Sequence, residues 1–115
     1  MIRAAFFREG ERLTGFECEG HAGYAESGSD IVCAGVSALL TACANAIEAL
    51  VGAAPEIRTN EEIGYLKLTL PRGITPRQSE DASLLLKAAR LGLEDINRQY
   101  PDNVRVITKD RRSCT

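Results

Sequence analysis

Histidine is almost absent from this chain, since His21 is the only one among 115 residues. Tryptophan is missing altogether, and the four cysteines contain no C-x-x-C pair. Zinc would have to be held by one imidazole and scattered thiols, without the close ligand pair that zinc sites use. We therefore expect no metal and no other cofactor.

A secretion signal and a basic excess are also missing. No N-terminal segment combines a positive start, an apolar run and a small-residue cleavage site, so we expect a cytoplasmic protein with reduced thiols. The longest apolar stretch, Ile31–Val51, is interrupted by polar side chains, which weighs against a membrane span. The net charge of −2 weighs against direct nucleic-acid binding.

Hydrophobic residues make up 44% of the chain and charged residues 26%, the balance of an ordinary globular protein. A chain of this length fits one domain that buries roughly two-thirds of the surface its unfolded form exposes. No linker, repeat or low-complexity segment divides it. We expect a single domain over residues 1–115.

Alternating apolar residues predict five strands, and apolar stripes at helical spacing predict two helices. The expected elements are strands over Met1–Arg8 and Leu13–Glu19, a helix over Ile31–Val51, strands over Ile57–Thr59 and Gly64–Leu70, a helix over Pro76–Tyr100 and a strand over Asn103–Thr108. Gly15 changes the parity of apolar positions in the second strand, which predicts a β-bulge. The order ββ-α-ββ-α-β indicates an α+β fold with two helices against a mainly antiparallel sheet. Lys109–Thr115 is expected to be a solvated tail.

The first expected helix carries a polar stripe on an otherwise apolar surface. Asp30 is placed to cap its N-terminus and Gly52 to end it. Cys33 heads the stripe, and the residues that follow it at intervals of four, four, four and three are Ser37, Thr41, Asn45 and Glu48. The rest of this helix must be covered by the sheet, by the second helix or by a partner subunit.

His21 lies in a glycine-bearing loop, Gly20–Ser29, shortly before Cys33, a pairing typical of a cysteine nucleophile with an imidazole base. An ordinary thiol with a pKa of about 8.5 is mostly protonated at neutral pH. The dipole at a helix start contributes about 0.3–1 kcal/mol, less than one pKa unit, whereas a neighbouring imidazolium lowers a thiol pKa by several units. The histidine is therefore the decisive partner. We expect the loop to swing it into place when a peptide binds.

Three segments around these residues form a distinctive motif, namely Gly20-His21-Ala22, Asp30-Ile31-Val32-Cys33-Ala34 and Val36-Ser37-Ala38-Leu39. They resemble the signature of the ribosomal-processing cysteine protease family, Prp, and the order of elements is similar over essentially the whole length. The resemblance implies an α+β fold, commonly a homodimer, with endopeptidase activity. It also implies a substrate, the N-terminal extension of the precursor of large-subunit ribosomal protein twenty-seven, which is cut after a hydrophobic segment ending in paired phenylalanines.

Carried over position by position, the resemblance makes His21 the catalytic base and Cys33 the nucleophile. Asp30 and Ser37 match the other polar positions of the motif. Gly35 stands where the family pattern has alanine, a departure that costs up to about 1 kcal/mol of helix propensity. Both catalytic positions keep the family's residue types, so the departure bears on local rigidity more than on activity.

The mechanism that follows is acyl transfer: His21 takes the thiol proton of Cys33, and the thiolate attacks a peptide carbonyl to form a thioester that water hydrolyses. The N–H groups of Cys33 and Ala34 are candidates for the oxyanion hole, because a helix start leaves donors free. Asp30 has two competing roles, capping the helix, which we favour slightly, or holding the His21 ring. Ser37 supports the thiol or the peptide, or bonds its own helix backbone.

Two other classes of function stay open on the residues alone. One is a non-catalytic module that binds a ribosomal protein or an assembly intermediate, although such a module has no use for an activated thiol. The other is a thiol redox or transferase protein, against which the lack of a C-x-x-C pair weighs. Of the remaining cysteines, Cys18 and Cys43 are expected in the core and Cys114 at the exposed terminus.

Overall fold

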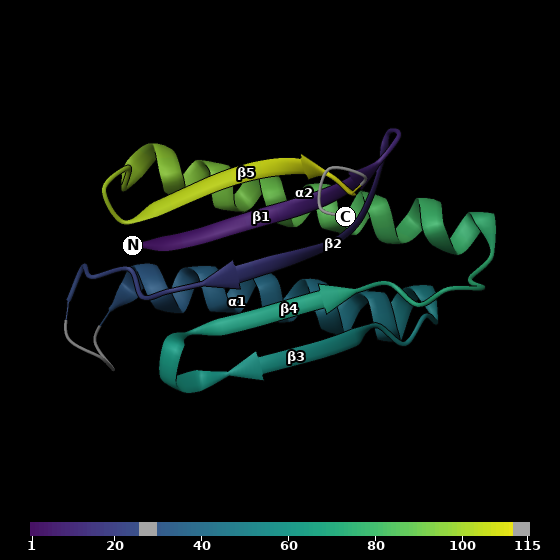
Figure 1. The fold of residues 1–115 in the computed structure, drawn as a ribbon, viewed down its shortest axis with the longest axis horizontal. Coiled ribbons are helices and arrows are strands. Elements are labelled where there is room, and N and C mark those ends of the chain that lie inside the picture. The colour runs from purple at the N-terminus through teal and green to yellow at the C-terminus, as the bar shows by residue number, and fades with distance from the viewer. Residues whose placement is uncertain (26–29, 112–115) are drawn as a thin grey trace.

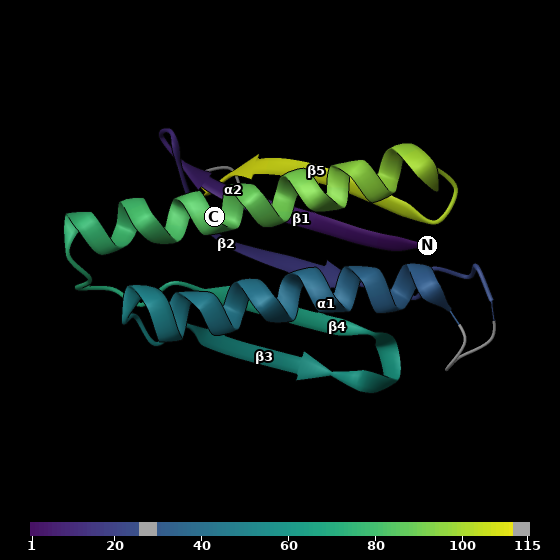
Figure 2. The same ribbon diagram turned by 180° about the vertical axis from the view of Figure 1, so that it is seen from behind.

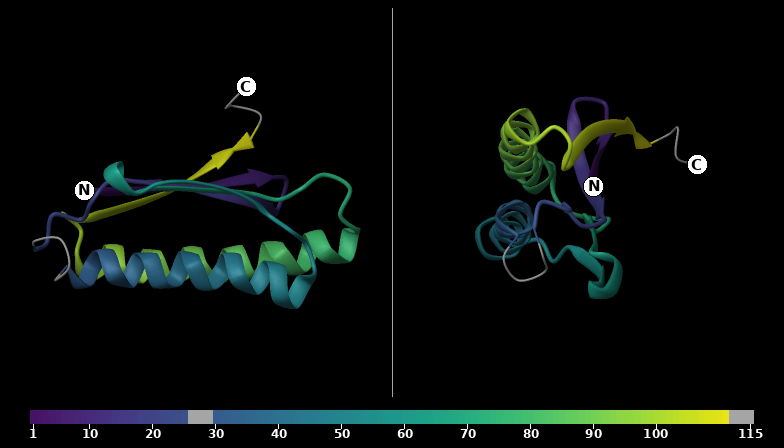
Figure 3. Two further views of the ribbon diagram at one scale, coloured as in Figure 1. Left: turned by 90° about the horizontal axis from the view of Figure 1, so that it is seen from below. Right: turned by 90° about the vertical axis from the view of Figure 1, so that its left-hand side faces the viewer.

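The computed structural model describes residues 1–25 and 30–111, so Cys114 and part of the predicted loop Gly20–Ser29 lie outside the described residues. The described chain forms two layers, a five-stranded sheet and two long helices that cover one of its faces (Figures 1 and 3). The elements are β1 (Ile2–Glu9), β2 (Arg12–Glu19), α1 (Ile31–Ala46), the π-helical turn η1 (Ile47–Val51), β3 (Glu56–Asn60), the 3-10 turn η2 (Glu61–Ile63), β4 (Tyr65–Thr69), α2 (Pro76–Gln99) and β5 (Val104–Asp110). This order confirms the predicted ββ-α-ββ-α-β arrangement and the α+β class.

The strands lie in the order β3-β4-β2-β1-β5 across the sheet. Neighbouring strands are antiparallel except β1 and β5, which are parallel. The predicted bulge is confirmed where Gly15 pairs with Phe7. The next pair along is Leu13 with Arg8, so Thr14 is the extra residue of β2.

The predicted tail Lys109–Thr115 is wrong over its first two residues, because Lys109 and Asp110, although exposed as expected, belong to β5. β5 continues to Asp110, which pairs with Arg8 near the end of β1. The same two residues form an ion pair, with Arg8 Nε 3.1 Å from Asp110 Oδ1. The parallel pairing with β1 supplies main-chain hydrogen bonds that a free tail lacks. The strand therefore continues beyond Thr108, where the alternation of apolar residues ends. Residues 112–115 lie outside the described residues.

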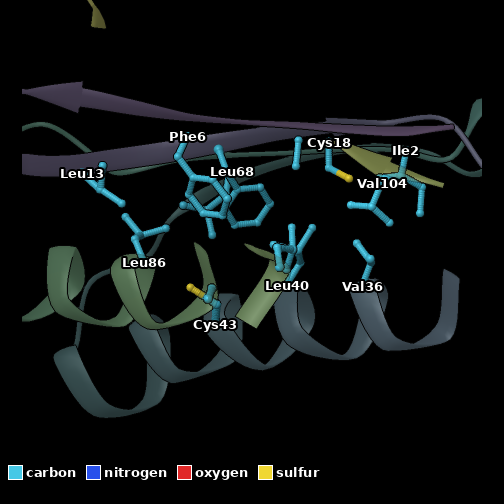
Figure 4. Close-up of a cluster of buried hydrophobic side chains, with 14 of the residues drawn as sticks. Ile2, Phe6, Leu13, Cys18, Val36, Leu40, Cys43, Leu68, Leu86 and Val104 are labelled. Atoms are coloured by element: carbon cyan, nitrogen blue, oxygen red, sulfur yellow. The ribbon is translucent and has the colours of Figure 1, made fainter. Parts of the chain in front are cut away.

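The core lies between the sheet and the helix layer (Figure 4). Phe6 and Phe16, from neighbouring strands, are fully buried with their ring centroids 5.8 Å apart. Cys18 and Cys43 are also buried, as predicted. Burial raises the pKa of both thiols to about 11, and the proximity of Cys33 adds to the rise at Cys18. Both thiols are therefore neutral near pH 7 and pack as small hydrophobic groups.

Helix α1 packs one side into the core and leaves the other side bare. Val32, Val36 and Leu40 lie in the core, and Gly52, with a φ of 78°, ends η1. By length and composition alone, Ile31–Val51 has the properties of a membrane span, with a mean hydropathy of 1.7, and a core helix passes the same test. Only 28% of the most apolar 18-residue part of this segment is buried. Within the described residues, the sheet and α2 therefore do not give the helix the predicted cover on several sides.

Helix α2 begins as the sequence predicts. Thr75 Oγ1 accepts from the N–H of Gln78 at 3.1 Å, and Gln78 Oε1 accepts from the N–H of Thr75 at 2.9 Å. Pro76 occupies the first turn. The helix runs beside α1, and its C-terminal end lies at the same end of the molecule as the start of α1 (Figure 2). This arrangement brings residues from the start and the end of the chain to one place.

We expect Gly35→Ala to raise the free energy of unfolding by about 0.5–1 kcal/mol, because glycine in a helix interior loses more chain entropy on folding. A Cβ at this position would lie 3.5 Å from Ile96 Cδ1, an ordinary van der Waals contact. Urea unfolding measures the change. Gly92→Ala is the matched control, because its Cβ would lie 2.9 Å from Leu39 Cδ1 and the crowding offsets its gain. A Gly35→Ala chain less stable than the original would contradict this account.

Candidate active site

The thiol of Cys33 lies on the first turn of α1, and Asp30 holds that turn in place. One carboxylate oxygen, Asp30 Oδ1, accepts hydrogen bonds from the N–H groups of Val32 at 2.9 Å and Cys33 at 3.0 Å. Asp30 is thus the N-cap of α1, as predicted. The cap fixes the peptide planes on both sides of Val32 and thereby the direction in which the cysteine side chain leaves the helix.

The other carboxylate oxygen of Asp30 holds the loop that follows β2. Oδ2 accepts from the N–H of Tyr24 at 3.1 Å and of Ala25 at 3.3 Å. The Cys33 N–H, more than the other donors, holds the pKa of the Asp30 carboxyl below its ordinary value, although burial opposes this. A carboxylate has about four acceptor sites, and these main-chain donors use them. The competing role, in which Asp30 holds the His21 ring, has no support in these contacts.

His21 follows β2 and rests against the connection between β3 and β4. The Gly20 N–H donates to the Ile63 carbonyl at 3.1 Å, and His21 Nε2 lies 3.3 Å from the Glu62 carbonyl oxygen. Gly64 packs directly against this loop and leaves no room for a side chain. A Cβ at this position would lie 2.5 Å from the Gly20 carbonyl oxygen and 3.2 Å from His21 Cε1. A carbonyl oxygen accepts and never donates, so this contact assigns the proton of the neutral ring to Nε2 and leaves Nδ1 as the basic nitrogen.

Cys33 and His21 line the same open cleft beside the first half of α1. This cleft has a volume of about 520 Å³, and its lining includes Asp30, Ser37 and Glu61. A second cleft of about 370 Å³ shares the cysteine, the histidine, the serine and the glutamate with the first. The two clefts therefore form one continuous depression, which we call the site groove. The four side chains that the sequence singled out for chemistry all border it.

The second part of the site groove has an apolar wall. Half-buried Leu66 and Tyr65 of β4 line it, and the buried Val36 and Leu40 of α1 lie beneath. The Tyr65 hydroxyl donates to Glu17 Oε2 at 2.6 Å, and this hydrogen bond raises the pKa of the hydroxyl. A thiol and an imidazole thus lie beside a channel that suits apolar side chains of an extended peptide.

The predicted oxyanion donors are already occupied. The Cys33 N–H donates to Asp30 Oδ1, and the Ala34 N–H donates to the main-chain oxygen of Asp30 at 3.1 Å. The cap and the first helical turn use these groups, so the structure does not support the oxyanion role predicted for them. A different N–H points at the sulfur, because the buried Ala22 donates to Cys33 Sγ at 3.2 Å.

Sequence reasoning missed the groups that hold the loop from outside the motif. The Glu62 carbonyl contacts the His21 ring, and the side-chain amide of Asn103 donates to the Ala22 carbonyl at 2.8 Å. Neither has a sequence signal, since one is a main-chain atom and the other a lone asparagine after a helix. Over residues 1–25 and 30–111, no group of three or more His, Cys, Asp and Glu side chains is arranged to hold a metal ion.

Comparison with known proteins finds relatives over nearly the whole chain. The family model described as cysteine protease Prp matches residues 1–105. The ribosomal processing cysteine protease Prp of Bacillus subtilis is 38% identical over 109 residues, which cover 94% of this chain and 97% of that protein. The protein of the same name from Staphylococcus aureus is 34% identical over 98 residues, 85% of this chain and 89% of its own.

A solved structure gives the same result in three dimensions. Prp from S. aureus, crystallised with a covalently linked product peptide, superposes with a TM-score of 0.84 at 31% identity, covering 95% of this chain and all of that one. These findings favour a protease over a binding module or a thiol transferase. On the strength of the family match and of these relatives, the chain is a cysteine protease and belongs to the Prp family of ribosomal processing proteases.

Proposed function

We propose that this protease removes the N-terminal extension from the precursor of large-subunit ribosomal protein twenty-seven and cuts after paired phenylalanines. The observation that carries the proposal is the site groove, in which Cys33 and His21 lie next to an apolar wall that includes the half-buried Leu66. A related Prp from S. aureus, with a TM-score of 0.79 at 30% identity, has been solved with a substrate peptide. The substrate class comes from the family resemblance, and the groove fits it.

The thiol and the imidazole share the chemistry. His21 Nδ1 takes the proton of Cys33, and the sulfur attacks the peptide carbonyl carbon, so that a C–S bond forms and the carbonyl electrons move to oxygen. When the tetrahedral intermediate collapses, the C–N bond breaks and the leaving amine takes its proton from His21. Water, deprotonated by the same imidazole, then attacks the thioester and releases the carboxyl product and the thiol.

Two main-chain groups assist these steps. The Glu62 carbonyl, 3.3 Å from His21 Nε2, orients the neutral ring with its lone pair on Nδ1 and accepts a stronger hydrogen bond once the ring becomes an imidazolium. The Ala22 N–H, 3.2 Å from the Cys33 sulfur, stabilises the thiolate. The carbonyl of Glu62 thus takes the orienting role that a carboxylate or an amide has in other triads.

We expect the purified chain to cleave a peptide that carries the extension on the carboxyl side of the paired phenylalanines. Cys33→Ala is expected to abolish cleavage, and His21→Ala to lower the rate by about 10² to 10⁴, the usual contribution of a general base. Mass spectrometry of the fragments gives the rate and the position of the cut.

Cys43→Ala is the matched control, because the Cys43 thiol lies in the same helix but is buried. This variant is expected to cut the peptide at the same position and rate as the unsubstituted chain. A second peptide, with both phenylalanines replaced by alanine, tests the role of the apolar wall and is expected to be cut at least about tenfold more slowly, since each large apolar side chain contributes roughly 1.5–3 kcal/mol when buried. Equal cleavage of both peptides, or cleavage by Cys33→Ala, would contradict the proposal.

The position of the imidazole depends on Gly64. We expect Gly64→Ala to lower kcat/KM by about tenfold or more, because the new Cβ would lie 2.5 Å from the Gly20 oxygen and displace the His21 loop. Gly73→Ala is the matched control: its φ of +81° is as unfavourable for alanine, but no atom lies within 4 Å of its Cβ. Peptide cleavage and thermal unfolding are measured for both variants. Equal activity of the two would show that the close approach of Gly64 to the loop is unimportant.

We also infer a homodimer that covers the bare side of the helix layer. Leu84 and Leu91 of α2 are 67% and 59% exposed, and Leu50, at the end of η1, is 79% exposed. Sedimentation equilibrium is expected to give twice the 12.5 kDa of one chain, and Leu84→Glu with Leu91→Glu is expected to give the monomer. Ile107→Glu on β5, which is also exposed, should leave the mass unchanged. A mass of one chain for the unsubstituted protein would contradict the inferred homodimer.

A further inference from the structure

Ala22 is held from two sides, and one of the holding groups comes from the far end of the chain. Its N–H donates to Cys33 Sγ at 3.2 Å, and its carbonyl accepts from the side-chain amide of Asn103 at 2.8 Å. The residue itself is buried, with 2% of its surface exposed. Asn103 therefore reaches the residue that contacts the sulfur, across 81 positions of sequence.

The backbone of Asn103 is itself fixed. Its carbonyl accepts from the Ile2 N–H at 2.8 Å, at the start of β1, and its N–H donates to the Tyr100 carbonyl at 3.0 Å, at the end of α2. The turn that carries the Asn103 side chain is therefore anchored both to β1 and to the end of α2. The side-chain amide is thus oriented before any peptide binds, as a supporting group for an active site must be.

The same turn makes a second contact with the loop. The ring of Tyr100 meets the ring of Tyr24 edge to face, with centroids 5.3 Å apart and an interplanar angle of 82°. On the other side of the loop, Asp30 Oδ2 accepts from the N–H of Tyr24. The described part of the loop after His21 is thus held between the start of α1 and the end of α2, two elements that meet at this end of the molecule (Figure 2).

We propose that Asn103 is a positioning residue of the active site: it acts through Ala22, whose N–H it keeps directed at the Cys33 sulfur. This rests on the proposed function in that the sulfur is taken to work as a thiolate. An N–H donor stabilises an anionic sulfur only while distance and angle hold, and hydrogen bonds to charged groups are about twice as strong as neutral ones. Loss of the Asn103 amide removes one of the two hydrogen bonds that hold Ala22, so its N–H is no longer kept directed at the sulfur.

The test compares two asparagines of the same region. Asn103 and Asn97 both donate a side-chain amide hydrogen to a main-chain carbonyl, but the acceptor of Asn97 is Val104 on β5, outside the loop. Iodoacetamide alkylation of Cys33 is followed against pH by mass spectrometry in the original chain, in Asn103→Ala and in Asn97→Ala. The fragment ions separate Cys33 from Cys18 and Cys43.

We expect Asn103→Ala to shift the midpoint of the alkylation profile to higher pH by about one unit, so that alkylation becomes close to tenfold slower at pH values well below the original midpoint, with an unchanged plateau at alkaline pH. Asn97→Ala should keep the original midpoint. Should Asn103→Ala fold poorly, Asn103→Leu, which keeps the size of the side chain and lacks the donor, is expected to show the same shift. Circular dichroism identifies the variants that fold.

The proposal is overturned if folded Asn103→Ala or Asn103→Leu has the same alkylation midpoint as the unsubstituted chain. It is also overturned if Asn97→Ala shifts the midpoint by as much as Asn103→Ala does. The readout requires no peptide, so it is independent of the substrate. If the precursor peptide is not cut while the midpoint still shifts, the proposed substrate fails and the role of Asn103 stands. If the peptide is cut with normal kcat/KM by Asn103→Ala and the midpoint does not move, the role of Asn103 fails alone.

Discussion

One carboxylate ties the active site together. Within residues 1–25 and 30–111, Asp30 accepts four main-chain hydrogen bonds, two from the first turn of α1 and two from the loop after β2. A single ionised group thus sets both the start of the helix that carries Cys33 and the path of the loop that carries His21. Because its partners are main-chain N–H groups, the arrangement tolerates side-chain changes in the loop but not a loss of charge at Asp30. The polar site therefore depends on a residue that takes no part in bond making.

The fold was predictable where local chemistry decides it. Pro76 lies at the predicted start of α2, Gly52 ends η1, which follows α1, and Gly15 changes the parity of apolar positions where the bulge in β2 lies. Each of these signals acts within a few residues. The end of β5 was not predictable in this way, because Asp110 is held by a parallel ladder to a strand about 100 residues earlier, and no pattern within Lys109–Thr115 reports that ladder.

The same distinction applies to the site. Residue type and spacing single out Cys33 and His21, which the structure brings to one cleft, and the prediction of Asp30 as the cap is confirmed. The oxyanion donors were predicted from a general property of helix starts, and that property fails here because the cap of Asp30 and the helical turn occupy the N–H groups of Cys33 and Ala34. The contacts from Glu62 and Asn103 depend on how distant elements meet in space, which a single sequence does not encode locally.

The parallel pairing of β1 with β5 has a consequence for the order in which the parts of the site assemble during synthesis. A ribosome makes the chain from its N-terminus, so Cys33 and His21 are made well before β5 and the turn that precedes it. Until that turn joins the start of β1, where Ile2 donates to Asn103, the loop lacks one of its supports and β1 lacks one of its neighbours. The support that Asn103 gives to this loop is therefore missing until a residue 81 positions after Ala22 has been made and has reached the start of β1.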